Sequence, residues 1–272
     1  MAFDLETYQW RSARLDLTGL DWDRAPRSPL PDAAIDALLY MMDIEGHTTV
    51  YLSELLVSKV CMDPSISGFL HVWAYEEMFQ SLALRRFLTA YGVRVPDERQ
   101  RTLRASTNLK RIRTTLGVMV ASHLTDAFAA VYLTIGAINE LSTLWGYQLL
   151  AERAGHPLLT ELLHRIGRQE RQHYAFYRSQ AAARLARSAA ARALTRRYLD
   201  ARFVAVGAGE KSRAEVARVV RYLYAGEDGR AAAQRIDEEI GRLPGLRGAY
   251  LARRTLDRAR ARGATLAVCQ TG

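Results

Sequence analysis

Apolar residues recur at steps of three and four along most of the chain after residue 32, which is the period of an amphipathic α-helix. Asp63 and Pro64 mark one helix start, because aspartate caps free backbone amides and proline suits the first helical position. Strand signals are weak, since β-branched runs are short and no Asn-Gly or Asp-Gly turn separates alternating segments. We therefore expect an all-α protein. The four longest helices are predicted over residues 33–61, 64–92, 107–153 and 158–186.

The segments on either side of these helices have a different pattern. Residues 1–32 show no sustained period and contain three prolines, which predicts an irregular N-terminal arm. Residues 33–187 hold the long helices and predict a four-helix bundle. Residues 188–272 predict a helical C-terminal extension. Its helices are expected near 188–203, 212–224, 228–241 and after residue 245.

Composition excludes several classes of protein. The 272 residues are 49% hydrophobic and 25% charged, so the chain can bury a core and is neither disordered nor fibrous. Two cysteines, Cys61 and Cys269, are too few for a disulfide framework, and neither a signal peptide nor an apolar run of 18 residues occurs. We expect a cytoplasmic protein without a membrane segment. The net charge of +9 favours anionic partners, but only three of 38 basic residues are Lys. A GC-rich genome produces such a bias as readily as a binding surface does, so nucleic acid is not the expected partner.

Four glutamates interrupt the apolar faces of the predicted long helices, one on each helix. A buried carboxylate without a partner is costly or takes up a proton, so four of them facing one another require a cation. Helix bundles meet this need with two metal ions, held by one Glu on each of two helices and a Glu-x-x-His pair on each of the others. The alternative is that the many arginines neutralise glutamates at the rim of the core. The candidates are Glu45, Glu77, Glu140 and Glu170.

One Glu-x-x-His pair is complete in this sequence. Glu170 and His173 are three residues apart, which places both side chains on one face of a helix. The corresponding pair begins with Glu77 but ends with Gln80, so its histidine is missing.

Sequence spacing favours Glu45 as the candidate from the first helix. Glu45 and Glu77 are 32 residues apart, and Glu140 and Glu170 are 30 residues apart, as expected of two helix hairpins related by a pseudo-two-fold axis. Glu54, which is 23 residues from Glu77, is the fallback.

Two segments resemble a known family. The segment WAYEEMFQ (residues 73–80) is similar to a Trp-x-x-Glu-Glu-x-x-His helix, and QERQH (residues 169–173) is similar to an Asp-Glu-x-x-His helix. Both motifs belong to the soluble acyl-carrier-protein desaturases of the ferritin-like di-iron carboxylate superfamily, and the resemblance covers residues 33–186. It implies a ferritin-like bundle that binds iron. The ligands that it implies are Glu45, Glu77, Glu140, Glu170 and His173.

The departures from the family pattern concern one pair of positions. Gln80 replaces a ligand histidine, and Gln169 replaces the aspartate that orients that histidine. An amide oxygen is a weaker donor than imidazole for iron, so Gln80 is a weak ligand or only contacts the ligands. Three outcomes stay open: two irons with one held weakly, a single iron or one iron with a second metal, and a retired site. Glu76, Gln169 and Tyr174 are expected to contact the ligands rather than the metal.

The resemblance also implies a reaction and its partners. The family uses two reduced irons and O2 to oxidise an acyl chain on an acidic acyl-carrier protein, with an electron donor such as a ferredoxin, and it forms homodimers. We accordingly expect desaturation or hydroxylation of a carrier-bound acyl chain or of a small molecule. A basic stretch around the second inter-helix loop is either the docking surface for the carrier or a solvated linker. Its candidate docking residues are Arg85, Arg86, Arg111 and Arg113.

Two other functions remain open. An N-oxygenase of an arylamine has the same fold, but that family carries an additional histidine where this chain has Ile166. A non-catalytic scaffold with a degenerate metal site is the second alternative, because Gln80 and Gln169 weaken one metal position. Gly136 and Ala137, one turn before Glu140, either leave room beside the metals for a slim substrate or allow close helix packing.

Overall fold

The computed structural model describes residues 3–99, 108–125 and 127–270. Within these ranges the regular structure is helical and no strand occurs, which confirms the all-α prediction. The elements are α1 (Leu5–Arg11), η1 (Trp22–Arg27), α2 (Asp32–Leu56), η2 (Lys59–Met62), α3 (Pro64–Ala90), α5 (Asn108–Leu124), α6 (Ala127–Ala154), α7 (Pro157–Arg187), α8 (Ala189–Arg202), α9 (Arg213–Leu223), α10 (Gly226–Gly241) and α11 (Leu251–Gln270).

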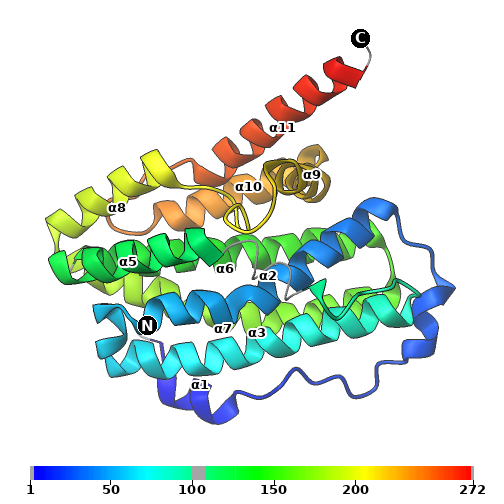
Figure 1. The fold of residues 1–272 in the computed structure, drawn as a ribbon, viewed down its shortest axis with the longest axis horizontal. Helices are drawn as coiled ribbons and strands as arrows, with labels where there is room; N and C mark the ends of the chain where they lie inside the picture. The colour runs from blue at the N-terminus through cyan, green and yellow to red at the C-terminus, as the bar shows by residue number, and fades with distance from the viewer. Residues whose placement is uncertain (1–2, 100–107, 126, 271–272) are drawn as a thin grey trace.

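Four long helices, α2, α3, α6 and α7, form the centre of the molecule, and we call them the central helices (Figure 1). The hairpins α2–α3 and α6–α7 each pack along their length, and contacts of α2 with α6 and of α3 with α7 join the two hairpins. The N-terminal arm runs along the outside, where α1 contacts α3 and η1 contacts both α3 and α7. The arm is therefore next to the two helices that carry the sequence motifs.

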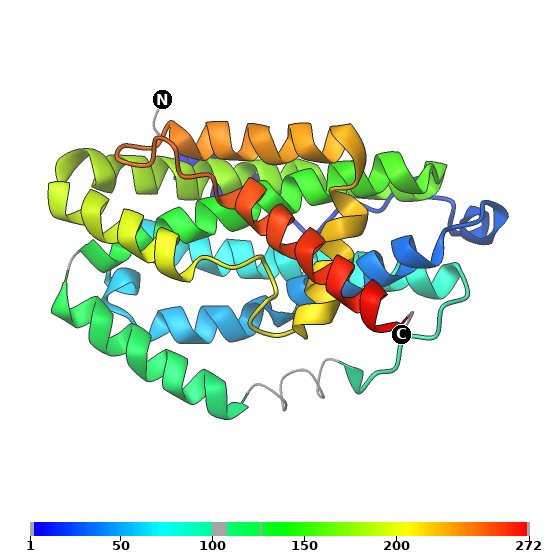
Figure 2. The same cartoon turned by 90° about the horizontal axis from the view of Figure 1, so that it is seen from above.

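The C-terminal helices lie on the opposite side of the central helices from the arm (Figure 1). Helix α8 packs on α6 and α7, α9 packs on α2 and α11, and α10 packs on α6 and α11. Figure 2 shows α11 and α9 crossing over the central helices. The C-terminal extension therefore covers the face formed by α2 and α6.

Local sequence signals explain several helix boundaries. Asp63 caps α3 by accepting a hydrogen bond from the Ser65 amide at 3.0 Å, and Pro64 begins the helix as predicted. His156 caps α7 by accepting from the Leu159 amide at 3.2 Å. These caps satisfy amides that the helix itself leaves without a partner.

Two helices differ from the prediction. The single helix predicted over 107–153 is instead α5 and α6, with a break at Thr125, whose hydroxyl accepts a hydrogen bond from the Ala127 amide at 3.2 Å. The helix predicted over 33–61 ends at Leu56 and is followed by η2. There the Ser58 amide and hydroxyl both bond to the Leu55 carbonyl, which terminates α2. Side-chain hydrogen bonds to backbone groups therefore end both helices at points where the apolar period of the sequence continues.

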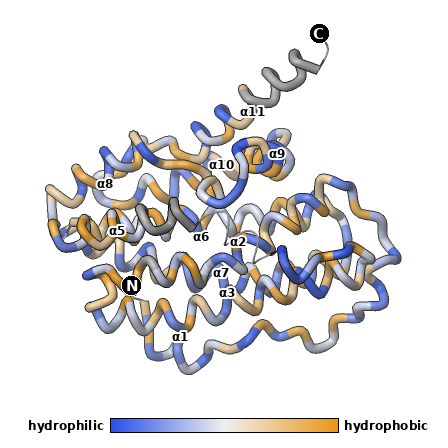
Figure 3. Tube along the Cα trace, in the orientation of Figure 1, coloured by the Kyte–Doolittle hydropathy of each residue, from blue (hydrophilic) through white to orange (hydrophobic). Residues whose placement is uncertain are grey.

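Helix α6 is the one helix in the described ranges that is long and apolar enough to cross a membrane. It is also a core helix, because it packs against α7, α2, α8 and α10 and carries a buried glutamate at its centre. Hydrophobic and hydrophilic residues alternate along the other helices (Figure 3). Length and composition alone are weak evidence for a membrane span here.

Candidate metal centre

The central helices bring the predicted ligand residues into one buried region. Helix α2 contributes Glu45, α3 contributes Glu77 and Gln80, and α6 contributes Glu140. Helix α7 contributes the Glu-x-x-His pair. All six side chains are buried, and those of Gln80, Glu170 and His173 are fully buried.

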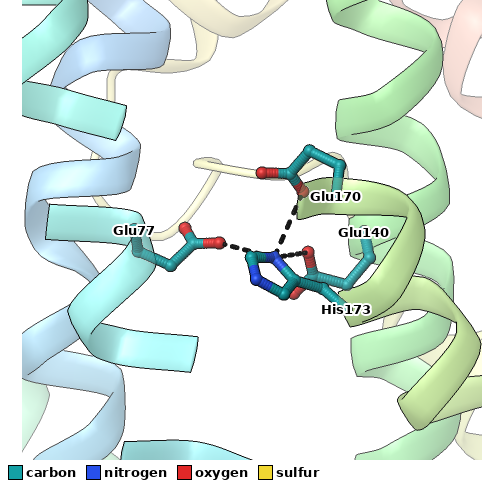
Figure 4. A group of neighbouring side chains, drawn as sticks. All are labelled: Glu77, Glu140, Glu170 and His173. Atoms are coloured by element: carbon teal, nitrogen blue, oxygen red, sulfur yellow. Dashed lines mark ion pairs between the residues drawn. The ribbon is translucent and has the colours of Figure 1, made fainter. Parts of the chain in front are cut away.

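Four of these side chains converge on one point (Figure 4). One ligand atom from each of Glu77, Glu140, Glu170 and His173 lies within 4.8 Å of the others. His173 Nδ1 is 3.1 Å from Glu77 Oε1, 3.6 Å from Glu140 Oε2 and 3.8 Å from Glu170 Oε2. The cluster can therefore hold a metal ion between α3, α6 and α7.

The second ring nitrogen of His173, Nε2, is hydrogen-bonded to a carboxylate outside the cluster. Nε2 donates to Glu76 Oε2 at 2.7 Å, and Glu76 also accepts from Tyr8 Oη at 2.7 Å and Ser12 Oγ at 2.5 Å. Nε2 therefore keeps its proton, and Nδ1, which faces the three carboxylates, is the ring nitrogen that a metal ion would bind in place of a proton. A carboxylate in this position is one of the usual partners that orient metal-ligating histidines. The expectation that Glu76 contacts a ligand rather than the centre agrees with this geometry.

Protonation provides the positive charge that the carboxylates require. Burial lowers the pKa of His173, but the surrounding carboxylates, first Glu140 and Glu170, outweigh burial and raise it well above the usual value. Burial and neighbouring carboxylates raise the pKa of Glu77 to about 7 and that of Glu140 to about 8. Without a metal, protons occupy the place of a cation.

Glu45 lies at the edge of this cluster, on the side of Glu77. The carboxyl groups of Glu77 and Glu170 both act on Glu45 electrostatically. Tyr147 donates to Glu45 Oε1 at 2.5 Å. Burial and these carboxylates together raise the pKa of Glu45 well above its usual value. The region thus holds more carboxylate than one ion needs.

Arginines do not neutralise these glutamates. Among the hydrogen bonds and ion pairs of the described side chains, none joins Glu45, Glu77, Glu140 or Glu170 to Lys or Arg. Both carboxylate oxygens of Glu170 and Oε1 of Gln80 are buried without a hydrogen-bond partner. Buried polar atoms of this kind are rare unless an ion or water satisfies them. This donor set fits a metal ion and contradicts neutralisation by arginine.

The two glutamines that depart from the family pattern contact each other. Gln80 Nε2 donates to Gln169 Oε1 at 3.4 Å, and Gln169 Nε2 donates to the Ala13 carbonyl at 3.0 Å. With this amide orientation, chosen by the hydrogen-bond network, Gln80 keeps Oε1 free toward the buried interior. Gln169 therefore links the metal region to the arm, as expected of a residue behind a ligand.

The structure places other predicted residues away from the cluster. Tyr174 lies beside Arg178 and Glu239, because one residue beyond His173 is about 100° further round the helix. Arg85 pairs with Asp97. The side chains of Glu54, Arg111 and Arg113 lie outside the described residues, and Arg86 stacks over the Trp22 ring at 4.5 Å.

Close packing occupies the space beside Gly136. A Cβ at this position would overlap the ring of Tyr177 on α7. Gly136 thus lets α6 and α7 approach each other, and it leaves no room for a substrate. Of the two explanations considered above, helix packing is the correct one at this glycine.

Three residues that donate hydrogen bonds to Glu45 or Glu76 were not predicted from the sequence. Tyr147 is seven residues after Glu140, two helical turns along the same face, so helical period could have revealed it. Tyr8 and Ser12 lie in the N-terminal arm, where no period relates them to α3.

Comparisons of the chain with protein-family models, with curated proteins and with solved structures find no match. The geometry of the centre therefore carries the functional interpretation.

Proposed function

We propose that the chain is an O2-dependent di-iron oxidoreductase with a ferritin-like bundle, which oxidises an acyl chain by desaturation or hydroxylation. The observation that carries this proposal is the set of ligand atoms from Glu77, Glu140, Glu170 and His173 within 4.8 Å of one another. Carboxylate and imidazole donors from facing helices suit iron and are the arrangement used by di-iron bundle proteins.

A second ion accounts for the carboxylate beyond these four residues. Glu77 and Glu170 each interact with His173 on one side and with Glu45 on the other. In this proposal His173 and Glu140 would hold one ion, Glu45 would hold the other, and Glu77 and Glu170 would be available to either. Gln80 would offer the second ion a neutral oxygen, which would hold that ion more weakly.

The protein residues around the ions orient and shield them. Iron bound there would supply the electrons for O2 activation. Glu76, held by Tyr8 and Ser12, keeps Nδ1 of His173 directed at the carboxylates. Tyr147 holds Glu45 in place through its hydroxyl. Burial of all these groups keeps water away from the reacting site.

The proposal includes partners and location. The substrate is an acyl chain on an acidic carrier protein or a small molecule, the electron donor is a ferredoxin-like protein, and the enzyme is a cytoplasmic homodimer. Arg85 and Arg86 are already engaged by Asp97 and Trp22, so docking of a carrier there would compete with these contacts. Acyl oxidation is preferred to N-oxygenation because Ile166 is fully buried among apolar residues and supplies no further imidazole.

Iron loading of ligand and control variants tests this function. Wild-type protein, loaded anaerobically, reduced and exposed to O2, is expected to consume O2 and change its near-ultraviolet absorption. His173→Ala should abolish both, whereas His164→Ala, an exposed histidine on the same helix, should retain both. Circular dichroism checks that each variant folds. Wild-type protein that takes up iron without reacting with O2 would refute the enzyme and favour the scaffold.

Restoring the missing histidine tests the role of Gln80. Gln80→His should tighten binding of the second iron, because imidazole is the stronger donor. If Gln80→His binds each of the two irons with the same affinity as wild type, residue 80 does not reach the second ion.

A further inference from the structure

An apolar pocket lies between the central helices and the C-terminal helices. Its volume is about 100 Å³. Ile44 of α2 and Ile138 of α6 line it on one side, and Val219 of α9 and Leu256 of α11 line it on the other. Figure 2 shows α9 and α11 crossing over this part of the molecule. The C-terminal extension therefore makes half of the pocket wall.

The pocket reaches the candidate metal centre through one residue. Among the described residues that line it, Glu45 is the one carboxylate, and none is Lys, Arg or His. The same carboxyl group interacts electrostatically with Glu77 and Glu170 of the cluster. A group bound in the pocket thus lies against the side of the centre where the second ion is proposed. An anion would lose its hydration there without a described cationic side chain to compensate, whereas a neutral apolar group would gain from leaving water.

Direct contacts with α2 hold the outer wall of the pocket in position. Tyr40 Oη donates to the Val206 carbonyl in the loop between α8 and α9. At Gly207, where φ is +79°, a Cβ would overlap the Tyr40 hydroxyl, so this approach requires glycine. Lys211, at the end of the same loop, pairs with the buried Asp43. The loop is therefore attached to α2 at two points and defines the size of the pocket.

Small residues on α6 provide the space inside. Ser142 and Gly146 both line the pocket, and a Cβ at Gly146 would lie 3.0 Å from Met41 Cε and 3.7 Å from Leu223 Cδ1. Larger side chains on this face of α6 would fill the cavity. Apolar cavities of about 150 Å³ bind benzene or xenon, so this smaller pocket of about 100 Å³ suits a group no larger than a single ring or a short alkyl segment.

We propose that this pocket binds a neutral apolar group of the substrate against Glu45, and that the C-terminal helices determine which group fits. The identity of the bound group as substrate rests on the proposed function, but binding of an apolar ligand does not require a metal. The C-terminal extension is thus a specificity element that lies outside the region of family resemblance.

Ligand binding to the metal-free full chain tests the pocket. Benzene is the probe, and benzoate is its charged counterpart. Benzene should shift the methyl resonances of Val219, Leu223 and Leu256 in a saturable manner and raise the melting temperature. Benzoate at the same concentration should do neither.

A matched pair of variants locates the site. Val219→Phe fills the pocket and should weaken benzene binding at least about tenfold. Val204 lies in the loop between α8 and α9, and it is 58% exposed. Val204→Phe, the same change at this exposed residue, should bind benzene like wild type. Thr255→Phe fills the pocket from α11 and replaces Val219→Phe if that variant does not fold. Unperturbed wild-type methyl groups, or binding that survives both filling variants, would overturn the inference.

Metal content separates this inference from the proposed function. Val219→Phe should retain the iron content of wild type, because Val219 is not one of the candidate ligands. In the active enzyme, the variant should raise KM or shift the preferred chain length of the substrate. Saturable benzene binding in a chain that takes up no iron would leave the pocket in place and reject the di-iron enzyme.

Discussion

Replacing Asp43 by alanine removes a buried carboxylate that holds two cations against α2. The Asp43 side chain is 1% exposed and accepts from Arg99 Nε at 2.9 and 3.0 Å, from Arg99 Nη2 at 2.8 Å, and from Lys211 Nζ. Lys211 is only 9% exposed, whereas the Arg99 side chain is 32% exposed. The substitution therefore leaves one largely buried ammonium group without its main partner.

The expected loss of unfolding free energy follows from the exposed fractions of the Arg99 and Lys211 side chains. Removing one partner of a buried ion pair costs about 3 to 5 kcal/mol. The lower end applies here, because Arg99 can turn toward water and Lys211 retains Glu215 Oε1 at 3.9 Å. A loss of about 3 kcal/mol lowers the melting temperature by about 6 to 12 °C in a chain of roughly this length. The same change should free the loop that closes the apolar pocket.

Urea and thermal unfolding at pH 7 measure this loss against a control on the same helix. Asp36 pairs with Arg218 at 3.3 Å, but the two side chains are 45% and 55% exposed, so Asp36→Ala should cost less than about 1 kcal/mol. The gain in helix propensity from Asp to Ala is shared by both variants and cancels. Equal unfolding free energies for Asp43→Ala and Asp36→Ala would refute the reasoning.

Three further predictions concern the metal centre and its packing. Glu76→Gln should weaken metal binding about 10- to 100-fold, measured by competition with a chelator, and unchanged affinity would contradict its orienting role. Folding raises the pKa of Glu77 to about 7 and of Glu140 to about 8, so metal-free protein should lose stability as pH rises from about 4.5 to 8. Urea unfolding in the presence of a chelator measures this loss of stability, and a constant unfolding free energy over that pH range would contradict the prediction. Gly136→Ala should cost about 1 to 3 kcal/mol by overlap with a ring of α7, while exposed Gly117→Ala, with open space around its Cβ position, should be neutral or stabilising.

Helical period was sufficient to predict that the central segments are helical and that each carries an inward carboxylate. Glu45, Glu77, Glu140 and Glu170 occupy apolar faces in the sequence, and all four are buried in the structure. The apolar period did not predict the break at Thr125, where one side-chain hydrogen bond separates α5 from α6. A break of this kind depends on local hydrogen bonding that apolar spacing does not record.

Contacts between distant segments were beyond prediction from the sequence. Tyr8 and Ser12 reach Glu76 across 68 and 64 residues of chain, and an irregular arm has no period that gives its direction. The apolar pocket depends in the same way on where the C-terminal helices pack. The amphipathic pattern of α9 predicts a buried face, but not that this face closes a cavity next to Glu45.

Metal stoichiometry tests the central claim most directly. We would remove metals from the full chain, titrate ferrous iron anaerobically, remove unbound iron and determine the iron bound per chain by elemental analysis. The carboxylate cluster predicts about two irons per chain, the second weaker than the first, and loss of both in Glu170→Ala. No retained iron in folded wild-type protein, or equal retention in Glu170→Ala, would contradict a metal centre at this site.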